Sequence, residues 1–246
     1  MLESLEGKRG HTRIKQPFPA ERGLYGMPTL INNVETLAHL PAIVVNGADW
    51  YRNLGTASSP GTKIFCLSGD VTAPGSVEVE MGVTLRQLID GFAGGIKGGK
   101  TFKTALLGGA AGTFVPQSDL DVAMDFDALK ERGAVLGSGA VIVLAEDRPI
   151  AKMLHSILRF FEHESCGKCV PCRVGTRHLV DLLAASTDGV ARQGDWVRAL
   201  VDQSELMAKT ALCPLGQSPV LPIKSAARHF GRELRRGQAP SRGGAP

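Results

Sequence analysis

The sequence predicts an α+β protein in which a region of short strands is followed by a bundle of helices. Alternating apolar residues bounded by turn signals occupy residues 63–145, which is the pattern of short strands. From residue 148 onward, apolar residues recur at helical spacing instead. Within that second region, three cysteines follow one another at intervals of three residues, so we expect the functional site to lie in the bundle.

Composition limits the possible classes of protein. The 246 residues are 43% hydrophobic and 21% charged, as in an ordinary globular protein. The net charge of +4 is small and only 5% of the residues are aromatic, so we expect no nucleic-acid partner. No apolar run approaches the ~18 residues of a membrane span, and the first residues do not resemble a signal peptide. We therefore expect an intracellular chain with reduced thiols and no direct membrane insertion.

The N-terminal 60 residues alternate between helix and loop. Residues 2–10 have the pattern of a helix already under way, and residues 11–31 carry too many prolines and glycines for regular structure. This start indicates a chain that lacks a natural front half. Asn32 and Asn33 then precede an apolar pattern beginning at Val34, as helix caps do, although the same amides and helix end could hold an anionic cofactor. Shorter helices are predicted at residues 41–46 and 48–54.

The middle of the chain has the pattern of a small β-grasp-like unit after a linker at residues 56–62. A helix with Leu85, Leu88, Ile89 and Phe92 on one face follows the capping residue Thr84. The predicted strands are residues 63–68, 76–81, 104–107 and 137–145.

Two features of the middle region could be mistaken for functional sites. The glycine-rich run at residues 108–112 lacks the Lys-Ser/Thr ending of a phosphate-binding loop, so we predict a structural turn. Cys66 stands alone in an apolar stretch and is predicted to be a buried strand thiol.

The C-terminal region is predicted to be a helical bundle. Four helices are expected, at residues 150–161, 174–185, 195–208 and 219–235. Cys213 falls between the third and fourth, so the bundle can bring it to the cysteine run at one end. Residues 237–246 are rich in Gly, Pro, Ser and Arg and are predicted to be disordered.

The cysteines carry the clearest chemical signal. Cys166, Cys169 and Cys172 form a C-x2-C-x2-C run, and Cys213 supplies a fourth thiolate, which is the ligand set of a [4Fe–4S] cluster. A tetrahedral zinc site is the alternative, although zinc sites usually use two separated C-x2-C pairs, and plain buried thiols are another. A cluster held in this way indicates an electron relay, and we predict no catalytic residue in this chain.

The surroundings of the run agree with a negatively charged cluster. Lys168 and Arg173 offer compensating charge, and a helix predicted to begin just after Cys172 would direct free N–H groups at the sulfurs. His163 could be a ligand, but a fourth cysteine is already present, so we expect it to pack or to support the site.

Two motifs resemble the NADH-oxidising FMN and [4Fe–4S] flavoprotein subunit of respiratory complex I, the F-subunit family of NADH-quinone oxidoreductase. One is residues 164–175, with the sequence ESCGKCVPCRVG, and the other is PTLINNVET at residues 28–36, preceded by LEGKRG at residues 5–10. The resemblance extends from about residue 2 to residue 235. It implies that residues 1–60 are the last strip of a Rossmann-like flavin domain, residues 61–147 an SLBB β-grasp domain, and residues 148–236 a helical [4Fe–4S] domain with a disordered tail.

The same resemblance implies a reaction. In the family, NADH passes a hydride to FMN, and electrons then leave singly through the cluster to iron–sulfur partner subunits, one thioredoxin-like with a [2Fe–2S] cluster and one with several clusters. Asn32, Asn33 and Thr36 are the implied FMN contacts, and Cys166, Cys169, Cys172 and Cys213 the implied cluster ligands. The implied location is cytoplasmic, peripheral to the inner membrane through the complex, or in a soluble complex.

The departures from the family pattern matter as well. The glycine-rich FMN and NADH loops and the acidic pair near the nicotinamide precede the segment at which this sequence begins. We therefore expect this chain alone to bind FMN weakly or not at all and not to oxidise NADH. Diaphorase subunits of NAD-linked hydrogenases and formate dehydrogenases share the cluster motif and are one alternative. The other is a non-catalytic docking module in which a metal only holds the helical bundle together.

Overall fold

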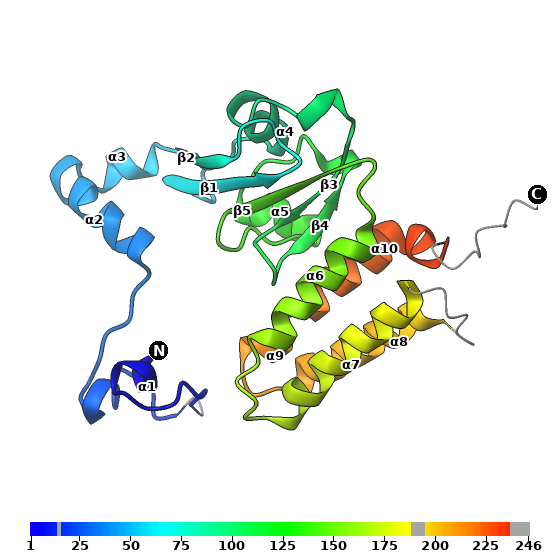
Figure 1. Cartoon of the computed structure of the whole chain (residues 1–246). Coiled ribbons are helices and arrows are strands. Elements are labelled where there is room, and N and C mark those ends of the chain that lie inside the picture. The colour runs from blue at the N-terminus through cyan, green and yellow to red at the C-terminus, as the bar shows by residue number, and fades with distance from the viewer. Residues whose placement is uncertain (14–15, 188–194, 237–246) are drawn as a thin grey trace, which may run out of the picture.

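The structure is a computed structural model that describes residues 1–13, 16–187 and 195–236. An N-terminal segment, a mixed sheet and a helical bundle follow one another along the chain (Figure 1). A helix with the length and apolarity needed to cross a membrane is not found in the described ranges. The predicted disordered tail, residues 237–246, lies outside them.

In its described residues, the N-terminal segment contains three short helices and one longer one. They are α1 (Leu2–Leu5), the 3-10 helix η1 (Leu24–Gly26), α2 (Val34–Asn46) and α3 (Ala48–Arg52). The predicted cap is confirmed, since the Asn33 side chain accepts a hydrogen bond of 2.9 Å from the Glu35 N–H. The predicted break before Pro41 is wrong, because α2 continues through it. Proline removes one N–H from the helix ladder and crowds the carbonyl four residues earlier, and here Pro41 lies on an exposed face.

The sheet has five strands in the order β2-β1-β5-β3-β4. Their bounds are β1 (Thr62–Gly69), β2 (Gly75–Glu80), β3 (Phe102–Leu107), β4 (Thr113–Pro116) and β5 (Ala140–Ala145). The pair β1 and β5 is parallel at the centre, and the other neighbouring pairs are antiparallel. All four predicted strands are confirmed, but β4 is not predicted because four residues are too few to show a period.

The glycine-rich run forms the predicted turn. Leu107 pairs with Thr113, so residues 108–112 connect β3 to β4 as a hairpin. A Cβ built on Gly112 would lie 1.7 Å from the Leu107 carbonyl oxygen, which explains why glycine stands there.

One apolar core lies under the sheet and its short helices. The helical elements are α4 (Leu85–Gln87), the π-helix η2 (Leu88–Phe92), η3 (Lys97–Gly99), η4 (Gln117–Asp119) and α5 (Phe126–Glu131). Thr84 caps α4 as predicted, in a reciprocal capping box with Gln87. Leu85, Leu88 and Ile89 are buried in this core, but Phe92 is 48% exposed because the π-helix turns it off their face.

The prediction that Cys66 is buried is wrong. Strand side chains alternate between faces, and β1 directs Phe65 and Leu67 into the core, which leaves Cys66 on the exposed face. An apolar run predicts a strand buried on both faces, whereas β1 is buried on only one.

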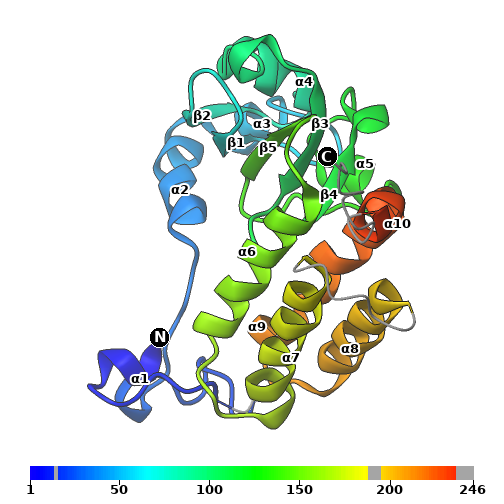
Figure 2. The same ribbon diagram turned by 45° about the vertical axis from the view of Figure 1, so that its right-hand side comes forward.

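The bundle packs around a second apolar core. Its helices are α6 (Ile150–His163), α7 (Val170–Thr187), α8 (Trp196–Thr210), α9 (Pro214–Gln217) and α10 (Val220–Arg236). All four predicted helices are confirmed, and α9 is an additional turn directly after Cys213. Figure 2 shows the bundle below the sheet, with α6 and α10 running up to it.

Two polar contacts join the bundle to the sheet. The Ser225 hydroxyl of α10 accepts a hydrogen bond of 2.9 Å from the Phe114 N–H of β4. The Glu233 carboxylate accepts one from Lys103 Nζ at 2.9 Å and one from the Ile150 N–H at 3.0 Å, so α10 also caps the start of α6. The end of the bundle that faces the sheet is thereby held against it.

Candidate metal centre

The fold brings the four predicted cysteines to one place. Cys166 and Cys169 lie in the loop between α6 and α7, Cys172 lies in the first turn of α7, and Cys213 precedes α9. All four line a single cavity. The cavity is also lined by Thr12, Gly167, Lys168, Leu212 and Leu215.

The four thiols line one common space. Among the described residues, no group of three or more His, Cys, Asp or Glu side chains is arranged around a single metal ion. Four thiolates are the ligand set of a [4Fe–4S] cluster and also of a tetrahedral zinc site. The residues present therefore fit a cluster, and metal analysis distinguishes it from zinc.

The loop that carries the cysteines is shaped by a glycine and closed by an arginine. Gly167 has a φ of +77°, a conformation that residues with a Cβ rarely adopt. Arg173 Nη1 donates a hydrogen bond of 2.7 Å to the Gly167 carbonyl oxygen. The helix α7 starts at Val170 and not after Cys172 as predicted, so Cys172 belongs to its first turn. The Arg173 N–H already bonds to the Cys169 carbonyl oxygen at 3.0 Å.

Cys172 is the buried member of the set. Burial raises the pKa of its thiol, and the neighbouring Cys169, Cys213 and Cys166 act in the same direction because negative charges repel. The Ser165 hydroxyl, 3.3 Å from Cys172 Sγ, opposes this rise. A thiolate that is costly in the bare protein becomes favourable once it is neutralised by a positively charged metal.

The pKa of the Cys213 thiol is shifted in the opposite direction. Burial acts to raise the pKa of its thiol, but hydrogen bonds from Thr12 and from the N–H groups of Leu215 and Gly216 outweigh burial, and the pKa is lowered. Gly216 lies so close to the site that an added Cβ would be 2.9 Å from Cys172 Cβ and 3.3 Å from Cys172 Sγ. The turn of α9 therefore packs directly on the cysteines.

Positive side chains surround the cysteine loop. Arg9 Nη2 donates to the Cys166 carbonyl oxygen at 3.3 Å, and Lys168 Nζ donates to the Thr12 carbonyl oxygen at 2.5 Å. With Arg173, three cations lie around the predicted ligands, and such charge stabilises an anionic cluster. The sequence indicates Lys168 and Arg173 but not Arg9 and Thr12, because contacts across more than 150 residues leave no local pattern.

The other predicted site residues are found elsewhere. His163 is an exposed residue at the end of α6 and is not among those that line the cysteine cavity. Asn32, Asn33 and Thr36 are exposed at the start of α2, where Asn33 acts as the helix cap. Their role as FMN contacts stays a prediction, since the structure assigns only the capping role.

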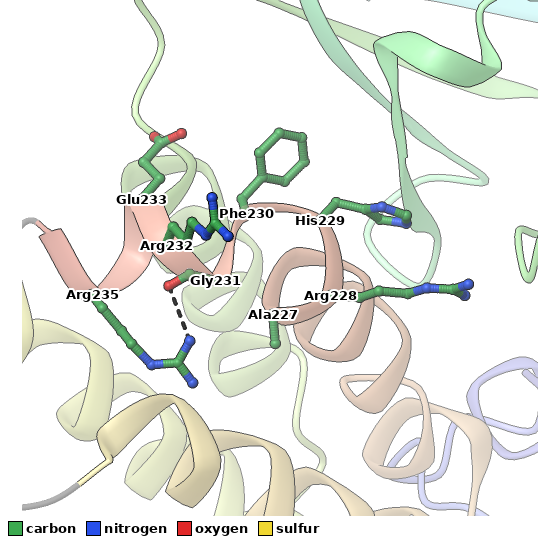
Figure 3. Close-up of a pocket in the computed structure, with 8 residues that line it drawn as sticks. All are labelled: Ala227, Arg228, His229, Phe230, Gly231, Arg232, Glu233 and Arg235. Carbon is green, nitrogen blue, oxygen red and sulfur yellow. Dashed lines mark hydrogen bonds between the residues drawn. The ribbon is translucent and has the colours of Figure 1, made fainter.

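A larger cavity on α10 does not form a comparable site. Figure 3 shows that Arg228, Arg232 and Arg235 of its lining point in different directions, with Arg235 turned back to the Gly231 carbonyl oxygen. Ligand sites need polar groups that converge, so the cysteine cavity remains the candidate centre.

Comparison with known proteins agrees with this choice. Residues 152–237 match the family described as the NADH-ubiquinone oxidoreductase-F iron-sulfur binding region. The match contains all four cysteines and starts within α6, so the family region coincides with the bundle.

Longer relatives match almost the whole chain. The second F subunit of NADH-quinone oxidoreductase from Rhizobium meliloti (strain 1021) is 44% identical over 238 residues, which are 95% of this chain and 55% of the relative. NADP-reducing hydrogenase subunit HndC of Solidesulfovibrio fructosivorans is 43% identical over 233 residues, 95% of this chain and 47% of the relative. The chain thus spans about half the length of these curated relatives.

A solved structure supports the same relationship. A chain of an NAD+-reducing [NiFe]-hydrogenase in the H2-reduced state superposes with a TM-score of 0.86 at 36% identity. The superposition covers 98% of this chain and 41% of the hydrogenase chain. The quinone-oxidoreductase and hydrogenase relatives are similar to this chain to nearly the same degree, so sequence identity alone does not assign it to one of the two branches.

Proposed function

We propose that the four cysteines hold a [4Fe–4S] cluster and that the chain relays electrons as the C-terminal part of an NADH-oxidising flavoprotein subunit. The observation that carries the proposal is the single cavity lined by Cys166, Cys169, Cys172 and Cys213 within the family's iron–sulfur region. When bound, such a cluster accepts and releases one electron at a time. The chain's own contribution is to hold four thiolates, shield them by packing, and surround them with cations.

The remaining parts of the proposal rest on the resemblance of the sequence to the F-subunit family. We assign residues 1–60 to the last strip of a flavin domain, residues 61–147 to an SLBB β-grasp domain, and residues 148–236 to the cluster domain. The parallel pair β1 and β5 has β2 on one side, in a hairpin with β1, and the β3–β4 hairpin on the other, which supports the β-grasp assignment. In a complete protein, FMN would contact Asn32, Asn33 and Thr36, and NADH would be the electron donor.

Exposed apolar residues support the view that α2 needs a covering domain. Val34 is 79% exposed and Val44 80% exposed, although both belong to a helix rich in apolar side chains. Large exposed apolar surface is usually covered in the functional assembly. A flavin-binding domain would cover this surface of α2, and the longer relatives have enough additional residues to form one. Iron–sulfur partner subunits would receive the electrons. The complex would be either peripheral to the membrane or soluble.

A second candidate is the diaphorase subunit of a hydrogenase or formate dehydrogenase. The similarity to HndC and to the hydrogenase chain favours it as specifically as the similarity to the Rhizobium meliloti protein favours complex I. Both candidates use the same cluster, and the genes beside this one would distinguish them.

Metal analysis of protein purified without oxygen tests the proposal. We expect close to four irons and four sulfides per chain with little zinc or flavin. Cys213→Ser should lose most of the iron, because three thiolates hold a cube poorly. Cys66→Ser is the matched control, since Cys66 is exposed on the sheet and should leave the iron content unchanged. One zinc and no sulfide would refute the electron relay and favour a metal-stapled docking module.

A further inference from the structure

The two edges of the sheet differ in how they are covered. The outermost strands are β2 and β4. The edge at β4 is covered by α10, whose Ser225 hydroxyl accepts the Phe114 N–H. Among the described strands, β2 pairs only with β1, and Figure 1 shows it at the margin of the sheet, near α4. An uncovered strand edge is a template for a further strand.

The pairing of β1 fixes which backbone groups of β2 face outward. The Cys66 N–H donates at 3.0 Å to the carbonyl oxygen of Gly139, which directly precedes β5. Backbone groups of successive strand residues point to opposite sides, so Phe65 directs its N–H and C=O toward β2. There it lies opposite Val77. Val77 therefore uses its own backbone groups to bind β1.

Every second residue of β2 turns its backbone groups away from the sheet. Ser76, Glu78 and Glu80 alternate with Val77 and therefore direct their N–H and C=O groups outward. These outward groups have no hydrogen-bond partner in the part of the chain that the structure describes. The side chains alternate too, since Glu78 and Glu80 are exposed whereas Val77 and Val79 are half-buried against the core.

A groove runs along this open edge. It is lined by β2 and the turn after it on one side, and by α4 and η2 on the other. Val79, Val83 and Phe92 give the groove an apolar part, and Phe92 is 48% exposed. An extended segment beside β2 would direct alternate side chains into this groove and the others along the exposed face of the sheet.

The groove is also acidic. Glu78, Glu80 and Asp90 line it, and none of these carboxylates forms an ion pair within the described residues. Arg86, a cation of the same lining, is already held by Asp121 through hydrogen bonds of 2.6 and 2.9 Å. A basic segment would therefore be attracted to this edge, and an acidic one would be repelled.

We propose that the β2 edge binds an extended segment of a partner protein in which lysine or arginine alternates with apolar residues. The backbone of that segment pairs with the outward groups of β2, its apolar side chains enter the groove, and its cations face Glu78 and Glu80. A second copy of this chain fits less well, because pairing two such edges would bring carboxylates together. The edge contains none of the four cysteines of the candidate centre, so the proposal goes beyond the electron relay and does not depend on it.

Binding of a synthetic peptide to the full chain, measured by fluorescence anisotropy, tests the proposal. The probe is a dye-labelled eight-residue peptide in which lysine and valine alternate and both ends are blocked. A peptide of the same composition, with all lysines before all valines, tests the alternation. We expect the alternating peptide to bind saturably and at least about threefold more tightly, since only its cations all lie on one face.

Hydrogen exchange on the unmodified chain locates the bound peptide. The amides of Ser76, Glu78 and Glu80 should exchange more slowly when the peptide is present, because their N–H groups gain acceptors. The amides of Val77 and Val79 already bond to β1 and should change less. Absence of slowing at Ser76 and Glu78 would overturn strand pairing at this edge.

Two substitutions separate backbone pairing from charge. Ser76→Pro removes an outward N–H but no bond to β1, and should weaken binding about three- to tenfold. Glu78→Gln keeps the side-chain shape without its charge, and should weaken binding about two- to fivefold. Glu131→Gln is the matched control, since Glu131 is exposed and does not line the groove, and should bind like the unmodified chain.

The outcomes that contradict the proposal are specific. Equal binding of the two peptides, or unchanged binding in either substituted chain, would overturn it. So would sedimentation of the unmodified chain as a dimer that Ser76→Pro abolishes, because a second copy would then occupy the edge. If Ser76→Pro does not fold, hydrogen exchange on the unmodified chain decides the point without it.

Discussion

Gly216 offers a strict steric test of how the bundle supports the cysteines. A Cβ at this position would lie 2.7 Å from Ala211 Cβ, 2.9 Å from Cys172 Cβ and 3.3 Å from Cys172 Sγ. Two of these atoms are fixed directly to the backbone, so neither can turn away as the end of a long side chain could. Gly216→Ala must therefore move α9 away from α7 or displace Cys172.

The magnitude follows from two opposing contributions. Overpacking by one methyl group costs about 1–3 kcal/mol, and two contacts below 3 Å place this case in the upper half of that range. Alanine in a helix recovers up to about 1 kcal/mol relative to glycine. The expected net loss is about 1–2 kcal/mol, and each kcal/mol lowers the Tm of a chain of this size by about 2–4 °C.

The assay combines thermal unfolding with iron content. Gly216→Ala should melt about 2–8 °C lower and hold less iron, because the displaced thiol is a predicted ligand. Gly91→Ala is the matched control, since a Cβ at Gly91 meets no atom within 4 Å. Its Tm should stay the same or rise slightly. A Gly216→Ala protein with unchanged Tm and iron would refute the view that α9 packs tightly on Cys172.

Two further substitutions test other parts of the structure. Hydrogen bonds from Arg148 hold the pKa of Asp70 below its ordinary 3.8, so this stabilisation is present above that pH and is lost as the pH falls through the folded-state value. Asp70→Asn should cost about 1 kcal/mol at pH 7 in urea unfolding, and a deficit that persisted in strong acid would contradict the assignment. Ser225→Ala should cost about 1–3 kcal/mol because it leaves the buried Phe114 N–H without its partner. The exposed Ser156→Ala should cost little, and equal losses in both would count against a special role for Ser225.

The helical bundle is predictable from the sequence because its signals are local. Apolar residues such as Leu154 and Leu158 recur at the spacing of one helix face, and both are buried in the bundle core. The cap at Asn33 and the capping box of Thr84 are predictable for the same reason, since each depends on residues within three positions.

Elements without a repeating pattern escape prediction or are predicted wrongly. The strand β4 is four residues long, too short to show alternation, and it exists because β3 offers it a partner. The burial predicted for Cys66 is wrong because an apolar run does not reveal that β1 has only one covered face. Phe92 is predicted on a helix face from which the π-helix η2 turns it away.

The candidate site shows the same contrast between features that have a local sequence pattern and features that depend on long-range packing. The four candidate ligands are predictable from the sequence, because the spacing of Cys166, Cys169 and Cys172 and the later Cys213 is a chemical pattern that needs no fold. The residues around these thiols become known only from the folded structure. Thr12 and the steric limit at Gly216 depend on chain segments that meet through packing, and packing is set by the whole core and leaves no trace in local spacing.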